Sequence, residues 1–351
     1  MLSFSRKKDR LLGLDISSTG VKMVELSVQQ GRYRVEKFGI EPLPANAVID
    51  KNINDAEAIG ESISRLVKRI KPSSKMAATA VSGSAVITKV IEMDKSMTDI
   101  ERESQIRLDA DQYIPYPLSE VNLDFEVLDE IEDVPGRVRV LLAASRSEII
   151  DQRVDALALG DLQTQIVDIE AYAIERSFEH MAASLNGEPE LVALIDIGHS
   201  HTTLYVLHHE KIIYSREQLF GGKQLTEEIQ RKYGMSFEEA ERSKHENLLP
   251  DDYQFEVLKP FMDSVVQQVT RSLQFFYSSS KFHNVEHIVV SGGTAAIYGL
   301  AELLEQNIGN PVTIANPFSQ MMVSSKVSTA EIDMNAPGLM VACGLALRSF
   351  D

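Results

Sequence analysis

The sequence contains a single cysteine, Cys343, so no disulfide can form within the chain. Disulfide-dependent proteins belong to oxidising compartments, and this composition instead favours a reducing one. Cys343 itself lies in an apolar helical pattern, where we expect a small buried residue rather than a reactive thiol. Long apolar runs are also lacking, since none approaches the roughly 18 residues that identify a membrane-spanning helix. We therefore expect a cytoplasmic protein that does not itself cross a membrane.

Basic residues are scarce, with 35 Lys and Arg against 52 Asp and Glu and a formal net charge of −17. The acids are spread along the chain, whereas nucleic-acid binding requires clustered cations that neutralise phosphates, so we expect no nucleic-acid partner. The first ten residues carry four cations but no apolar core after them, so they do not form a secretory signal. We expect a solvated leader there, and weak contact with anionic lipid or a partner's surface is the alternative.

Two segments far apart in the chain share one design, in which an apolar strand ends in an aspartate and a turn of small residues follows. The first covers residues 11–20 and contains Asp15, and the second covers residues 194–203 and contains Asp196. Small residues let backbone N–H groups approach phosphate oxygens, hydroxyls add donors, and each aspartate can hold a hydrated magnesium ion. The pair predicts two homologous half-clamps that close on one polyphosphate.

A third segment rich in glycine follows the predicted strand at residues 287–290. It consists of Ser291, Gly292, Gly293 and Thr294, and a helical pattern comes after it. Glycines there let the backbone approach a flat ring or a phosphate. In this order, the three segments resemble the phosphate-1, phosphate-2 and adenosine motifs of the actin, Hsp70 and sugar-kinase superfamily.

That resemblance implies an α/β fold of the actin-like or Hsp70-like ATPase type, with two lobes around a nucleotide. Segments 220–226 and 338–346 are similar to two helix regions of this superfamily. Residues 84–162 show the order strand, helix, strand, strand, helix, which predicts a small α+β, SHS2-like module inserted in the first lobe. No flexible linker flanks it, so we expect rigid packing. The expected division is a first lobe of residues 1–83, 163–189 and 336–351, the module at 84–162, and a second lobe at 190–335.

The position of the inserted module narrows the resemblance to two families, the FtsA division proteins and the PilM proteins of type IV pilus assembly. The opening segment 12–22, the segment 113–117 and the segment 271–277 look most like the PilM family. An FtsA-like protein should end in a linker and an amphipathic membrane-binding helix, whereas this sequence stops directly after its predicted last core helix.

The resemblance to PilM implies an ATP-binding scaffold in the inner-membrane platform that assembles type IV pili. It also implies a partner, the cytoplasmic N-terminal tail of a PilN-like membrane protein, bound as an extended peptide between the first lobe and the module. Other platform and motor components would be further partners, and attachment to the membrane would be indirect. Two alternatives remain open, a filament-forming division ATPase and a kinase or phosphatase of the sugar-kinase class. The latter needs an acidic base in a substrate cleft, and we find no sugar-site motif.

The resemblance also assigns residues to ATP or ADP and to Mg²⁺. Asp15 and Asp196 are expected at the magnesium ion and Lys22 at a phosphate, although a surface lysine on a strand is the alternative for Lys22. Glu241 and Lys244 are expected near the ribose and adenine, and an exposed helical ion pair is their alternative. The remaining expected nucleotide contacts are Ser17, Ser18, Thr19, Gly198, Ser200, Thr202, Gly222, Lys223, Thr226, Gly292, Gly293 and Thr294.

Hydrolysis requires a polar residue that orients water in line with the terminal phosphate. The residue that matches the catalytic glutamine of actin is Glu170, a carboxylate that a triphosphate repels, so we expect slow turnover at most. Ser17 stands where many superfamily members have glycine, and His199 and His201 bring imidazoles into the second clamp. These departures weaken the expected grip on phosphate.

Two adjacent histidines, His208 and His209, occupy a predicted hairpin turn. A metal pair would require both side chains on one side, whereas neighbours in a strand point to opposite faces. We therefore expect a solvated turn rather than a metal site.

Overall fold

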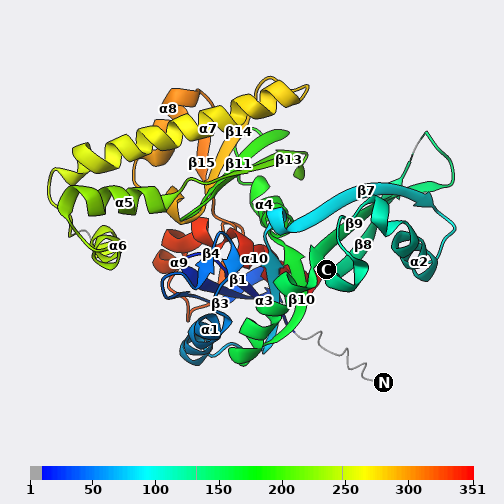
Figure 1. The fold of residues 1–351 in the computed structure, drawn as a ribbon. Helices are drawn as coiled ribbons and strands as arrows, with labels where there is room; N and C mark the ends of the chain where they lie inside the picture. The colour runs from blue at the N-terminus through cyan, green and yellow to red at the C-terminus, as the bar shows by residue number, and fades with distance from the viewer. Residues whose placement is uncertain (1–9, 132, 247) are drawn as a thin grey trace.

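The protein folds into two lobes with a smaller module beside them, shown in a computed structural model (Figure 1). The structure describes residues 10–131, 133–246 and 248–351. Most of the basic N-terminal segment lies outside the described residues. Among the residues that are described, no helix is long and apolar enough to cross a membrane.

The first lobe is built on a six-stranded sheet with the order β10-β6-β1-β2-β3-β16. Helix α1 is amphipathic, begins at an Asp55 cap and buries Ile59, Ile63 and Leu66 against the sheet. The strands are β1 (Leu12–Ile16), β2 (Gly20–Gln29), β3 (Arg32–Pro42), β6 (Met76–Val81), β10 (Gln163–Ile169) and β16 (Met322–Val323), with a small hairpin of β4 (Val48–Ile49) and β5 (Asn52–Ile53). The helices are α1 (Ala56–Ile70), α9 (Thr329–Asn335) and α10 (Met340–Leu347).

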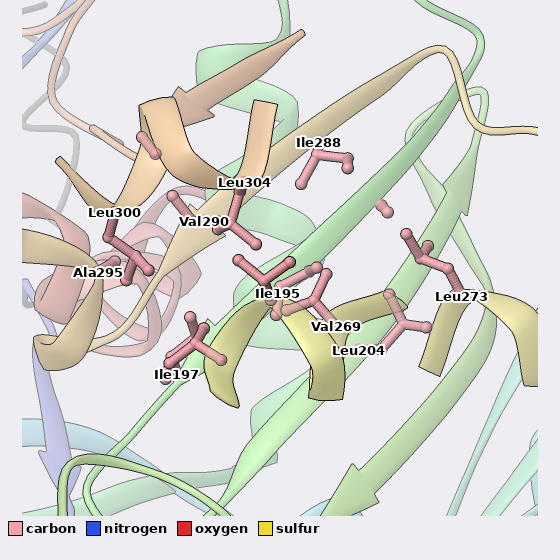
Figure 2. Close-up of a cluster of buried hydrophobic side chains, with 14 of the residues drawn as sticks. Ile195, Ile197, Leu204, Val269, Leu273, Ile288, Val290, Ala295, Leu300 and Leu304 are labelled. Carbon is pink, nitrogen blue, oxygen red and sulfur yellow. The ribbon is translucent and has the colours of Figure 1, made fainter. Parts of the chain in front are cut away.

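The second lobe has a five-stranded sheet with the order β13-β12-β11-β14-β15. Helix α7 covers one face of it, and an apolar stripe along this helix is buried, as Val269 and Leu273 show in Figure 2. The strands are β11 (Leu191–Ile197), β12 (Thr202–His208), β13 (Lys211–Gln218), β14 (His287–Ser291) and β15 (Val312–Ile314). The helices are α5 (Gly222–Tyr233), α6 (Phe237–Glu246), α7 (Lys259–Ser279) and α8 (Leu300–Ile308).

The two sheets repeat one topology. In each, a central strand (β1 or β11) pairs antiparallel with the next strand of the chain and parallel with a later strand on its other side. Both turns that follow the central strands carry an expected half-clamp. The repetition seen in the sequence is therefore a repetition of folded units.

Helices α4 (Glu170–Ala182) and α10 pack against each other between the two sheets. Their contact is close because Gly344 has no side chain, and a Cβ there would lie 1.8 Å from the carbonyl oxygen of Ala173. Cys343 on α10 is fully buried, which confirms its expected role as a small packing residue. This helix pair places the N-terminus of α4, and with it Glu170, beside the two half-clamps.

The module extends to the right of the lobes in Figure 1 and has its own three-stranded sheet, in the order β7-β9-β8. Its helix begins with a capping box between Thr98 and Glu101. Its elements are β7 (Val86–Asp94), α2 (Asp99–Asp109), β8 (Val121–Glu130) and β9 (Arg137–Arg146). Helix α3 (Ser147–Leu159) follows and buries Ala156 and Leu157 in the core of the first lobe. The domain boundaries and the SHS2-like type of the module stay predictions, but β16 and α9 pack with the sheet and core of the first lobe, whereas the division expected from the sequence extends the second lobe to residue 335.

Candidate functional site

A cleft of about 570 Å³ lies between the lobes, a size that suits a small-molecule ligand. Nearly all the site residues expected from the sequence line it, although they come from distant parts of the chain. Those that line the cleft are Asp15, Ser17, Ser18, Thr19, Lys22, Glu170, Asp196, Gly198, Ser200, Gly222, Glu241, Lys244, Gly292, Gly293 and Thr294.

Three expected residues do not line the cleft. Thr202 pairs with Ile197 in the β11 and β12 ladder and turns away from Asp196, and its hydroxyl donates to the carbonyl of Phe220 at 2.7 Å. The residue on the Asp196 face is Thr203, which lines the cleft instead. The pairing register of β11 and β12 decides which threonine faces the cleft, because successive strand side chains point to opposite faces.

The other two, Lys223 and Thr226, lie on α5. The ammonium of Lys223 is 3.8 Å from Glu227, one helical turn along the exposed surface. The Thr226 hydroxyl is fully buried, donates to Glu241 and accepts from Lys244 Nζ at 2.9 Å. Thr226 therefore positions Glu241 and Lys244, which are largely buried on the cleft wall rather than an exposed ion pair.

Lys22 and the two clamp aspartates form a buried charge cluster across the lobes. Lys22 Nζ lies 3.1 Å from Asp15 Oδ2, its partner across the β1 and β2 ladder. Burial by itself lowers the pKa of Lys22, but Asp15 and Asp196 outweigh it and raise the pKa above its ordinary value. Burial raises the pKa of Asp196, which accepts a hydrogen bond from Ser291 at 3.0 Å. Two carboxylates facing one cleft in this way suit a divalent ion.

Lys51 completes this cluster, and sequence reasoning missed it. It lies in the tight turn between β4 and β5 with a φ of 64°, and its ammonium contacts Glu170 Oε2 at 3.0 Å and Glu217 Oε2 at 2.7 Å. Burial raises the pKa of Glu170, and Lys51 opposes that rise. Glu217 belongs to the second lobe, so Lys51 joins the lobes. Nothing in the local sequence marks this lysine, since its partners are brought together only by the fold.

The backbone of the clamps is shaped for close approach. Ser17 donates both its N–H and its hydroxyl to the Gly20 carbonyl, so it shapes the first turn. Gly292 has a φ of 85°, and a Cβ there would lie 2.3 Å from the Ile197 carbonyl oxygen, so only glycine fits without strain. At Gly293 a Cβ would meet no atom within 4 Å, which leaves this part of the wall open to a ligand. The donor set and the open wall fit a nucleotide with its magnesium ion.

His199 and His201 both line the cleft, as the sequence indicated. Burial lowers the pKa of His199, which favours the neutral imidazole. The ring of His199 meets that of Phe237 edge-on at 6.0 Å, so packing orients it. These imidazoles form part of the wall.

A second cavity, of about 240 Å³, lies between the first lobe and the module, where the sequence predicts a peptide groove. Its first-lobe wall includes Lys51 and Ser82, so Lys51 borders both cavities. The module and α3 contribute mainly apolar side chains, together with one cation and two serines. These lining residues are Ser84, Ala85, Val86, Ile87, Ile114, Tyr116, Val121, Ala144, Ser145, Arg146 and Ile149.

Comparisons with known proteins agree with this geometry. The family described as "Type IV pilus assembly protein PilM" matches residues 13–350. A chain of the structure titled "PilM-PilN type IV pilus biogenesis complex" is 28% identical, and the match covers 98% of this chain and 99% of that chain with a TM-score of 0.80. The ethanolamine utilization protein EutJ from Carboxydothermus hydrogenoformans is 16% identical over 96% of this chain and 89% of that one, with a TM-score of 0.54, and shares the fold.

These matches bear out the predicted actin-like ATPase fold and favour pilus assembly over the division-protein and sugar-kinase alternatives. The chain belongs to the PilM family of type IV pilus assembly proteins.

Proposed function

We propose that the protein is a nucleotide-binding scaffold of type IV pilus assembly, which holds ATP or ADP with Mg²⁺ between its lobes. The observation that carries the proposal is the placement of two topologically equivalent half-clamps on one cleft, with Asp15 and Asp196 at their centre. The backbone turns at Ser18 and Ser200 would approach the phosphates from opposite sides. A bound magnesium ion would supply the positive charge that phosphates and clamp carboxylates both need.

The contacts of several cleft residues support a specific role for each of them. Lys22 is held charged by the aspartates and neutralises phosphate oxygens. Gly293 lets the adenosine lie against the backbone, and Lys244 is aimed by Glu241 and Thr226. Glu170 is paired with Lys51, which compensates its charge and fixes its carboxylate. A carboxylate held in this way is a poor activator of water, so we propose slow hydrolysis at most.

Calorimetric titration of the full chain with ATP and MgCl₂ tests nucleotide binding. Asp15→Ala and Asp196→Ala should each weaken binding by tenfold or more, because each removes a carboxylate from the ion's surroundings. Asp155→Ala, which removes an exposed aspartate on α3, is the matched control and should bind as the parent does. If both clamp variants keep the parent affinity, the nucleotide proposal is wrong.

We also propose that the cavity between first lobe and module receives the N-terminal cytoplasmic segment of a PilN-like membrane protein. Support comes from the match to a chain in a PilM–PilN complex and from the cavity's chemistry. Apolar side chains of an extended peptide would enter beside Ile87 and Ile149, and Arg146 would meet a peptide carbonyl or carboxylate. Strands β7 and β8 are the outer strands of the module sheet, so main-chain pairing can add affinity. Such a partner would bring the protein to the inner membrane.

A labelled synthetic peptide with the N-terminal sequence of the organism's own PilN provides the test. Tyr116→Ser removes part of the cavity wall and should weaken peptide binding at least tenfold. Tyr298→Ser is the matched control, because Tyr298 is 96% exposed and borders the nucleotide cleft instead. Equal peptide affinity of the parent and the Tyr116 variant would place the partner elsewhere.

A further inference from the structure

The turn that joins β12 to β13, at the end of the second lobe's sheet, brings two histidines together. Strand β12 ends at His208, and His209 and Glu210 follow with φ values of 49° and 64°. Two successive left-handed residues form the tight hairpin turn that matches strand twist. The premise that neighbouring histidines point to opposite faces is therefore wrong here, because His209 belongs to the turn and not to the strand. The ring centroids of His208 and His209 lie 4.2 Å apart.

Glu190 is held beside this turn by its backbone. Its carbonyl accepts the N–H of His209 at 2.9 Å, and its own N–H donates to the Glu286 carboxylate at 2.9 Å. Its side-chain Oε2 lies 3.9 Å from His209 Nε2. Glu190, His208 and His209 each offer one ligand atom, and these three atoms lie within 4.8 Å of one another. Strand pairing and the geometry of the turn thus bring the backbones of these three residues together.

We propose that Glu190, His208 and His209 form a binding site for a divalent first-row transition metal ion of the zinc class. Two imidazole nitrogens and one carboxylate oxygen form a ligand set that zinc uses with its fourth position open to water. Imidazole selects such ions over magnesium and calcium, which prefer oxygen ligands alone. Bonds to zinc of about 2.0–2.2 Å place ligand atoms about 3.4 Å apart. The side chains of His209 and Glu190 are 62% and 67% exposed, so they have room to rotate and bring their ligand atoms to this separation.

The surroundings orient one ligand and separate the site from the cleft. The ring of His208 also contacts Phe282, at 5.4 Å between centroids, so it is packed between two rings. Packing against Phe282 restricts the rotation of the His208 ring, whereas the other ring, that of His209, belongs to a proposed ligand. Glu190 precedes β11, and Asp196 stands near the other end of that strand, roughly 20 Å away at about 3.3 Å per residue. A bound ion would link the start of β11 to the turn between β12 and β13, and so stabilise that end of the sheet.

Titration of the untagged full chain with ZnCl₂, in competition with a chromophoric chelator and without nucleotide, tests the site. The parent should bind one zinc ion with a dissociation constant of roughly 10 µM or lower. His209→Asn and Glu190→Gln should each weaken zinc binding at least about tenfold. Asparagine tolerates the left-handed backbone of residue 209, so the turn should persist. Glu210→Gln removes a carboxylate from the same turn but outside the cluster, and should bind zinc as the parent does.

Thermal unfolding supplies an independent readout. Zinc should raise the midpoint of the parent and of Glu210→Gln, and should shift the midpoint of His209→Asn much less, because only bound ligand stabilises the folded state. Equal midpoints of all metal-free proteins would show that the variants fold alike. If His209→Asn does not fold without metal, Glu190→Gln replaces it in this comparison, because that substitution leaves the turn unchanged. The proposal is overturned if the parent takes up no zinc in this range, or if His209→Asn and Glu190→Gln bind it as tightly as Glu210→Gln.

Discussion

Replacement of Lys51 by methionine should destabilise the protein strongly, although the residue lies in a two-residue turn and belongs to the hydrophobic core of neither lobe. The change keeps the length of the side chain and removes the ammonium that contacts Glu170 and Glu217. Removing one partner of a buried ion pair costs about 3–5 kcal/mol, because the other charge stays buried and unpaired. The Glu170 and Glu217 side chains retain 17% and 26% exposure, so we expect a loss of about 2–3 kcal/mol.

The pH dependence of this loss identifies its cause. Burial raises the pKa of Glu170 and Lys51 opposes the rise, so the pKa should increase further in Lys51→Met. An acid whose folded pKa exceeds its unfolded pKa contributes stability at low pH and loses it as the pH rises through the folded pKa. The stability deficit of the variant should therefore be largest near pH 8 and should shrink as the pH falls toward 5.5, because the raised pKa lets Glu170 bind a proton more readily in the folded variant than in the unfolded chain.

Urea denaturation followed by far-ultraviolet circular dichroism measures these free energies, since the chain has no tryptophan to report by fluorescence. Lys75→Met is the matched control, because Lys75 pairs with Asp161 where both side chains are more than half exposed. Exposed pairs contribute about 0–1 kcal/mol. The reasoning is refuted if Lys51→Met costs no more than Lys75→Met at pH 8, or if its deficit is the same at pH 5.5.

Three other predictions concern the cleft and the core. In Glu170→Gln, turnover of ATP should change more than affinity, and the parent should hydrolyse at or below about 10⁻³ per second in a phosphate-release assay; rapid steady-state turnover would contradict this. Gly292→Ala should lower the free energy of unfolding by about 1–2 kcal/mol or more in urea, because a left-handed backbone is strained with a Cβ, and the carbonyl of Ile197 leaves it no room. Burial lowers the pKa of His287, so the free energy of unfolding should fall as pH drops below about 6.5, where the unfolded chain protonates first. His287→Gln should flatten that fall, and an unchanged slope between pH 7.5 and 5.5 would exclude His287 as its source.

Local patterns in the sequence were sufficient for the strands of both half-clamps and for the order of elements in the inserted module. The alternation and turn signals around Asp15 and Asp196 predicted both half-clamps, and the structure folds both as equivalent hairpins. The capping box at Thr98 and the apolar stripe along α7 are further features of this local kind. These features depend on contacts between residues a few positions apart, and local sequence records such contacts directly.

Prediction from the sequence was less accurate where a shift of one residue in strand pairing, or a partner distant in the chain, decides which way a side chain points. Thr202 and Thr203 are equally suitable in composition, and only the pairing of Thr203 with Asp196 turns the second one to the cleft. The rule that neighbouring strand side chains alternate did not apply to His209, because its φ is positive, a backbone conformation uncommon for residues other than glycine.

The sequence by itself determined that this chain builds two related lobes, each with a turn of small residues beside an aspartate, because periodicity, glycines and paired aspartates are local properties. The tertiary structure alone decided that Lys51 stands between Glu170 and Glu217, and that Glu190 meets His208 and His209 where β12 ends. Coulombic and coordination contacts form between groups that the chain separates by many residues. Their existence depends on how sheets and helices pack, which no short segment of sequence specifies.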